Sequence, residues 1–146
     1  MKFQISNLKL QYPYLCAAMI QYFKNINGVT TAIEKADDET WVNILPPLKH
    51  EEFAEVSETL EIPVEFLQDS LDIDERSRFE LENNVKLIVI KTPTENNSFN
   101  ESDSFYITIP ICIILTHNQI VTVNSFENGA IKKFLNTFQN RHPGKK

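Results

Sequence analysis

An acidic window between Glu61 and Asn84 is the part of this sequence with the clearest chemical potential. The window holds eight carboxylates and two arginines, Arg76 and Arg78, so it accounts for the whole formal net charge of −6. The rest of the 146-residue chain carries twelve acidic and twelve basic side chains and is neutral. Carboxylate oxygens are preferred ligands of hard divalent cations such as Mg²⁺ and Ca²⁺. The window is therefore interpreted either as a cation-responsive surface or as a well-solvated one.

Three carboxylates of this window are spaced to share one face of a short helix. Proline is favoured at the first position of a helix, and we expect a helix from Pro63 to about Leu71. On this helix Glu65, Asp69 and Asp72 follow the i, i+4, i+7 spacing of a single face. The apolar positions fall on the opposite face: Val64, Leu67 and Leu71.

Carboxylates at this spacing repel each other, at a cost of about 0.2–0.5 kcal/mol per pair. A bound divalent cation would relieve the repulsion. Screening by water and salt relieves it too, because the Debye length is about 8 Å at physiological ionic strength. The charge pattern alone therefore favours a solvated face. Mg²⁺ also prefers near-octahedral oxygen coordination and keeps several waters, so any site here is expected to be weak, water-mediated and shared with another surface.

The rest of the sequence lacks the residue patterns of common catalytic and metal sites. Its three glycines are isolated, so neither a phosphate-binding loop nor a dinucleotide fingerprint fits. Two separated cysteines, Cys16 and Cys112, indicate neither a disulfide framework nor a zinc site. The stretch that begins at Asp72 opens like an EF-hand loop but has Ser77 in place of the invariant glycine. We therefore do not expect an enzyme.

Length and composition predict one globular, cytoplasmic domain. The chain is 42% hydrophobic and 23% charged, which is ordinary for a folded domain. Its acidic balance argues against a nucleic-acid partner, which requires a basic face. The longest apolar stretch, 109–115, is far shorter than the roughly 20 residues of a membrane span, so no membrane contact is expected from this fragment. Residues 1–18 lack the apolar core of a signal peptide.

Alternating apolar residues and turn signals predict about seven strands and three helices. The expected strands are 20–26, 29–33, 41–45, 79–82, 85–90, 105–115 and 119–123. The expected helices follow Pro47, Pro63 and the candidate cap Ser125, with a polar loop at 92–104. In the strand at 79–82, Phe79 and Leu81 are expected to form the buried side. Short turns, such as Asn27-Gly28, favour antiparallel pairing. We expect an α+β domain with a mixed, mostly antiparallel sheet of about seven strands and helices packed on it.

Residues 41–91 resemble the cytoplasmic N-terminal domain of CorA-type magnesium and cobalt transporters. The similar segments are Trp41-Val42-Asn43-Ile44, 62–72 with the sequence IPVEFLQDSLD, 76–80 with RSRFE, and 85–90 with VKLIVI. Residues 113–118 and 121–123 are similar to a later hairpin of the family. The resemblance implies a CorA-like domain at 19–140, an N-terminal extension at 1–18, and a basic tail at 141–146 that leads to a stalk helix outside this sequence.

The resemblance also implies a site and a function. In this family a carboxylate of the short helix faces a partner from the next subunit, and regulatory divalent cations bind between them. Asp69 is similar to that carboxylate, and Gln68 is a neutral neighbour where some members have an acid. The resemblance implies a regulatory domain that binds Mg²⁺ or another divalent cation weakly at Asp69 and Gln68, in a homopentamer on the cytoplasmic side of the inner membrane. Two alternatives stay open: the equivalent domain of a zinc transporter, and a free-standing interaction module that docks a basic partner.

Overall fold

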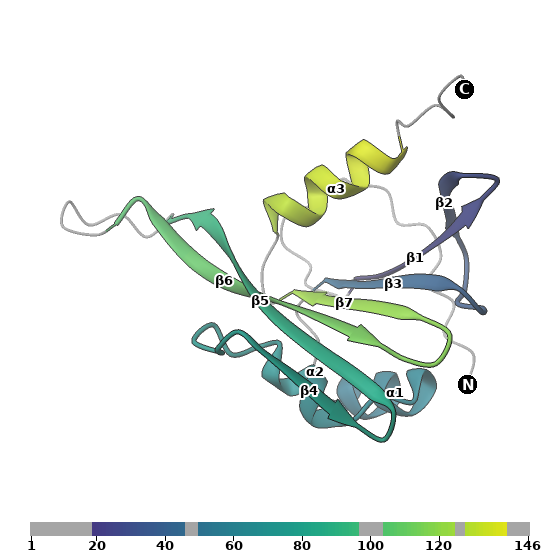
Figure 1. The fold of residues 1–146 in the computed structure, drawn as a ribbon, viewed down its shortest axis with the longest axis horizontal. Coiled ribbons are helices and arrows are strands. Elements are labelled where there is room, and N and C mark those ends of the chain that lie inside the picture. The colour runs from purple at the N-terminus through teal and green to yellow at the C-terminus, as the bar shows by residue number, and fades with distance from the viewer. Residues whose placement is uncertain (1–18, 46–49, 97–103, 125–127, 140–146) are drawn as a thin grey trace.

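The structure is a computed structural model that describes residues 19–45, 50–96, 104–124 and 128–139 (Figure 1). The expected N-terminal extension at 1–18 and the expected basic tail lie outside these residues, as does the expected cap Ser125.

Seven strands within the described residues form one sheet, in the order β2-β1-β3-β7-β6-β5-β4. The strands are β1 (Met19–Ile26), β2 (Val29–Ile33), β3 (Thr40–Leu45), β4 (Arg78–Glu82), β5 (Val85–Glu95), β6 (Tyr106–Leu115) and β7 (Ile120–Asn124). Neighbouring strands are antiparallel except β3 and β7, which run parallel. The predicted α+β class and the mixed, mostly antiparallel sheet are therefore confirmed.

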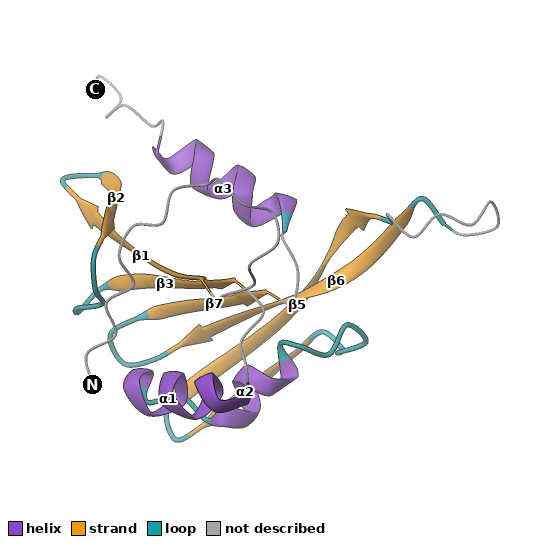
Figure 2. Ribbon diagram, turned by 180° about the vertical axis from the view of Figure 1, so that it is seen from behind, coloured by secondary structure: helices purple, strands orange, loops and turns teal. Residues whose placement is uncertain are grey.

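Helices cover the sheet from both sides. The described part of the chain contains α1 (His50–Leu60), α2 (Val64–Asp69) and α3 (Gly129–Gln139). Helices α1 and α2 lie on one face of the sheet and α3 lies on the other (Figures 1 and 2). Asn128 caps α3, because its Oδ1 accepts the N–H of Ala130 at 2.8 Å. None of these three described helices is long and apolar enough to cross a membrane.

The main core lies between the sheet and the pair α1 and α2. Helix α1 contributes Phe53, Val56 and Leu60, whose spacing of three and four residues predicts this inner face. The sheet contributes alternate residues, as expected where one face of each strand is covered. These residues are Val42, Ile44, Val85, Leu87, Val89, Cys112, Ile114, Val121 and Val123.

The inner face of α2 differs from the expected one. Phe66 and Leu67 are buried, whereas Leu71 is exposed. The helix ends before Ser70 and the chain then turns away, so Leu71 does not continue the apolar stripe. The expectation that Leu71 lines the inner side is wrong, and Phe66 takes that role.

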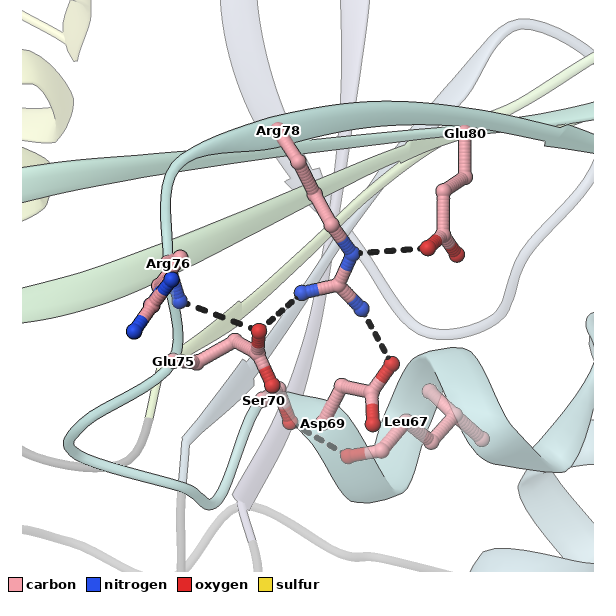
Figure 3. Close-up of polar contacts among 7 residues, drawn as sticks. All are labelled: Leu67, Asp69, Ser70, Glu75, Arg76, Arg78 and Glu80. Carbon is pink, nitrogen blue, oxygen red and sulfur yellow. Dashed lines mark hydrogen bonds and ion pairs between the residues drawn. The ribbon is translucent and has the colours of Figure 1, made fainter.

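Strand β4 exposes the side chains that were expected to be its buried side. Phe79 and Leu81 are both exposed. Phe79 pairs with Ile88, on the sheet face that carries α3, but α3 packs against β2, at the opposite edge of the sheet. The prediction is wrong because the fold covers the other face of this edge strand, where Arg78 and Glu80 point toward α2 (Figure 3).

The β5–β6 hairpin is longer than predicted. Strand β5 continues through Pro93 to Glu95, so part of the loop expected at 92–104 is strand. Strand β4 pairs with β5 only as far as Val89, and beyond that point β5 pairs with β6 alone. Pro93 therefore lies on a free strand edge, where its missing N–H leaves no bond unmade.

Polar side chains form a hydrogen-bonded chain on the face beneath α3. The Trp41 Nε1–H donates to Thr122 Oγ1 at 2.9 Å, and the Thr122 hydroxyl donates to Asn43 Oδ1 at 2.8 Å. The rings of Trp41 and of Phe134 from α3 pack in a T-shaped arrangement, with their centroids 5.3 Å apart. Asn124 is fully buried on the same face, and neither polar atom of its side chain has a hydrogen-bond partner in the described structure.

Candidate functional site

Arg78 is the centre of a cluster of charged side chains between α2 and β4. Its guanidinium donates from Nη2 to Asp69 Oδ2 at 2.5 Å and from Nε to Glu80 Oε1 at 2.8 Å. Its Nη1 donates to Glu75. Figure 3 shows the three carboxylates around the guanidinium. We call Asp69, Glu75, Arg78 and Glu80 the arginine cluster.

The local structure of α2 explains how Asp69 reaches this position. Phe66 and Leu67 are buried against the sheet and fix the rotation of the helix. The Ser70 hydroxyl donates to the carbonyl of Leu67 at 2.5 Å and secures the last turn. Asp69, the last residue of the helix, is only partly buried and turns its carboxylate toward β4 (Figure 3).

A tight turn then brings Glu75 to the same place. The N–H of Asp74 donates to Asp72 Oδ1 at 2.9 Å, and the N–H of Glu75 donates to the Asp72 carbonyl at 3.1 Å. The N–H of Arg76 donates to Glu75 Oε1 at 3.0 Å and orients its carboxylate. Glu80 needs no such turn, because it lies two residues after Arg78 on the same face of β4.

Solvent reaches every member of the arginine cluster to some degree. The side chains of Glu75 and Arg78 are 19% and 24% exposed, that of Asp69 is 33% exposed, and that of Glu80 is 44% exposed. Partial burial is the largest effect on the Asp69 carboxyl and raises its pKa, although the positive charge of Arg78 acts in the opposite direction. The pKa of Arg78 is also raised, because its carboxylate partners outweigh the effect of burial. With three carboxylates to one arginine, the formal charge of the cluster is negative.

The structure separates the residues that the sequence grouped together. Asp69 belongs to the arginine cluster, whereas Glu65 and Asp72 are exposed and outside it. Gln68 is exposed next to Asp69, and its backbone carbonyl accepts a hydrogen bond from the N–H of Leu71 at 3.0 Å. The helical face predicted from i, i+4, i+7 spacing is interrupted because α2 ends before Asp72.

Glu75 and Glu80 were not recognised from the sequence as parts of the candidate site. The alternation of Arg78 and Glu80 in a strand could have indicated that they share a face. The contact of Glu75 depends on the turn after α2, which no helical or strand spacing predicts. Among the residues that the structure describes, no group of three His, Cys, Asp or Glu side chains could hold a metal ion.

The candidate cation site therefore has suitable ligand types but few of them. A carboxylate at Asp69 and an amide at Gln68 offer the oxygen ligands that Mg²⁺ and Ca²⁺ prefer. One oxygen of Asp69 is already bonded to Arg78. The remaining ligands of a cation would have to be water or groups from another surface.

The fold is similar to that of solved CorA structures. The soluble domain of CorA from Methanocaldococcus jannaschii matches with a TM-score of 0.69 and 23% identity, over 90% of this chain and 50% of that one. The complete CorA magnesium transporter from the same organism matches with a TM-score of 0.65 and 21% identity, over 90% of this chain and 41% of the transporter.

A third solved structure extends the likeness beyond CorA. The cytoplasmic domain of ZntB from Vibrio parahaemolyticus RIMD 2210633 matches with a TM-score of 0.60 and 14% identity, over 83% of this chain and 49% of that one. No protein-family model and no curated protein sequence matches this chain. The chain thus shares the CorA soluble-domain fold and spans half or less of the length of these three structures.

Proposed function

We propose that this chain is the cytoplasmic domain of a longer transporter of the CorA superfamily that carries Mg²⁺ or Co²⁺. The match to the CorA soluble domain over 90% of this chain is the observation that supports the proposal most strongly. The match over 41% of the complete transporter also supports it, because a domain of a larger protein would give such a fraction. In this proposal the transported ion passes through residues outside this sequence, and the domain itself performs no enzymatic step.

The domain would regulate transport by sensing divalent cations. In this proposal Asp69 and Gln68 supply oxygen ligands to Mg²⁺ at a contact between subunits of a homopentamer, with water and a neighbouring subunit supplying the others. A cation bound there favours the assembled state, and its loss leaves carboxylates that repel, so the populations shift with cation concentration. The partly exposed position of Asp69 at the end of α2 supports this role, because a group from another subunit could reach it.

A zinc transporter of the same superfamily is the second candidate. The match to the ZntB cytoplasmic domain favours it, at a lower TM-score than the match to CorA. The two candidates share the fold of this domain and differ in the transported ion. Uptake assays of the full-length protein with competing Mg²⁺, Co²⁺ and Zn²⁺ separate them.

The complete reading frame tests the transporter assignment directly. We expect it to encode two apolar stretches of roughly 20 residues each beyond residue 146, since that is the length of a membrane-spanning helix. A reading frame without such stretches would contradict the proposal and favour a free-standing interaction module.

A further inference from the structure

We propose that residues 2–6, with the sequence KFQIS, add a strand to the free edge of β4 and so join the N-terminal segment to this edge of the sheet. These residues lie outside the described structure, and the support comes from the described edge and from the sequence of the segment. The inference assigns a role to residues 1–18 and does not depend on the transporter function proposed above.

Strand β4 has an open edge that carries exposed apolar side chains. It is the last strand of the described sheet, with β5 on one side and no described strand on the other. The backbone groups of such an edge can pair with a further strand. Phe79 and Leu81 of β4 are 61% and 60% exposed, and Ile90 of the neighbouring β5 is 41% exposed. Exposed apolar side chains grouped at an open edge indicate a surface that contacts another segment.

The sequence of residues 2–6 has the pattern of a strand that would fit this edge. Phe3 and Ile5 alternate with polar residues, which is the period of a strand with one apolar face. Side chains directly opposite each other on paired strands lie on the same face and contact each other. Phe3 and Ile5 can therefore lie beside Phe79 and Leu81.

The charges of the segment and of the edge are complementary. Residues 1–18 contain Lys2 and Lys9 and no acidic residue. On β4, Glu80 and Glu82 share the face opposite the apolar side chains. With the apolar residues of 2–6 on the apolar face, Lys2 falls on the face of these glutamates. Opposite charges on neighbouring strands favour pairing and like charges oppose it, so this segment fits β4 better than a second copy of β4 would.

The other edge of the described sheet, β2, offers neither feature. Its sequence, VTTAI, has no charged residue. Its exposed side chains, Thr31 and Ala32, are small. Apolar contact and charge therefore both favour β4 over β2.

The segment is long enough to reach β4. Paired residues link Ile20 of β1, through β3, β7, β6 and β5, to Arg78 at the start of β4, so the segment leaves the sheet level with that start. Six strand spacings separate β1 from a strand beyond β4, because five strands lie between them, and six spacings amount to about 29 Å. In extended form, the chain from residue 6 to residue 19 spans up to about 43 Å.

A nitroxide label on the 146-residue chain tests where the segment lies. The label is attached at position 7 in the variant that combines Asn7→Cys with Cys16→Ser. Cys112 stays unlabelled because it is buried, and burial raises its pKa to about 12. A nitroxide broadens the NMR signals of nearby amides. We expect residues 78–82 to lose most of their signal relative to the reduced label, and residues 29–33 of β2 to keep theirs.

Two double substitutions of the same kind show whether residues 2–6 form the strand. Phe3→Ser with Ile5→Ser should restore the signals of residues 78–82, because it removes the apolar side chains of the proposed strand. Leu8→Ser with Leu10→Ser is the matched control, since it removes as many apolar side chains from the next part of the segment. We expect the loss of signal to persist in this control.

A mixed sample distinguishes pairing within one chain from pairing between copies. Spin-labelled chain at natural isotope abundance is mixed with isotopically enriched chain that carries no label, and we expect the enriched chain to keep its signals. Loss of signal in the mixed sample would overturn the proposal, because the strand would then come from a second copy. Loss at β2 in place of β4, no loss at either edge, or equal effects of the two double substitutions would overturn it as well.

Discussion

The composition of the arginine cluster predicts that its members contribute unequally to stability. Removing the one positive side chain, Arg78, should lower the free energy of unfolding more than removing any one of the three carboxylates. Arg78→Gln leaves three carboxylates side by side with no positive charge among them. Asp69→Asn or Glu80→Gln instead lowers the excess negative charge. We therefore expect Arg78→Gln to be the most destabilising single change in the cluster.

The structure sets the size of the effect. Hydrogen bonds to charged groups contribute about 1.5–3 kcal/mol, but exposed ion pairs contribute only about 0.2–1 kcal/mol. The pair with Glu75 is the most shielded and the pair with Glu80 is the most exposed. We expect Arg78→Gln to lower the free energy of unfolding by about 1–3 kcal/mol, and Glu80→Gln to lower it by less than about 1 kcal/mol.

Asp69→Asn should cost least, because of the direction of its pKa shift. Burial raises the pKa of the Asp69 carboxyl in the folded state. A group with a raised folded pKa contributes stability that is complete below its unfolded pKa and is lost as pH rises through its folded pKa. At neutral pH the ionised carboxylate is therefore poorly favoured by the fold, and its replacement by a neutral amide is well tolerated.

Urea denaturation followed by circular dichroism measures these free energies, with unchanged m-values as evidence that the folded and unfolded states are comparable. A loss in Asp69→Asn equal to that in Arg78→Gln would refute the reasoning, because the single ion pair would then dominate over the excess of negative charge. A loss below about 0.5 kcal/mol in Arg78→Gln, which is typical of an unimportant surface change, would refute it as well.

Three further substitutions and one labelling experiment test other parts of the structure. Leu67→Ala should lower the free energy of unfolding in urea by about 2–5 kcal/mol, because the fully buried side chain would leave a cavity; a loss below 1 kcal/mol would contradict the core assignment. Asn124→Leu should raise that free energy by about 1–2 kcal/mol, since it removes a buried amide without partners among the described residues; destabilisation would contradict this. Cys112 should resist alkylation at pH 8 until the protein unfolds, as mass spectrometry of its peptide would show, because burial raises its pKa to about 12; rapid native labelling would be inconsistent with that burial. Lys24→Gln should raise the pKa of Asp37 measured by NMR, because the Lys24 hydrogen bond holds this pKa below its usual value and its stabilising effect is lost as pH falls through the folded pKa; an unchanged pKa would rule out that cause.

The sequence predicts the elements well because their signals are local. Strand alternation and the Asn27-Gly28 turn, where Gly28 has φ +84°, are enough to predict β1 and β2 as a hairpin. The spacing of Phe53 and Val56 is enough to predict the inner face of α1. The parallel pairing of β3 with β7 is different, because it joins segments about 80 residues apart and depends on how the whole sheet assembles.

The error at β4 occurs where a long-range contact decides the outcome. Phe79 alternates with polar residues as a buried strand residue would. Its exposure depends on where α3 packs, and α3 belongs to a distant part of the sequence. The candidate site shows the same limit. The sequence identifies Asp69 as a carboxylate near the end of a helix, whereas its contact with Arg78 depends on the turn that returns the chain from α2 to β4 (Figure 3).

Cell fractionation tests directly whether this fold belongs to a transporter. An antibody raised against residues 19–139 identifies the native polypeptide that contains them. We predict that this polypeptide is more than twice the length of the present chain, in proportion to the 41% of the complete CorA transporter that the chain covers. We also predict that it stays in the membrane fraction after alkaline extraction. A polypeptide of only 146 residues in the supernatant would contradict the proposed function.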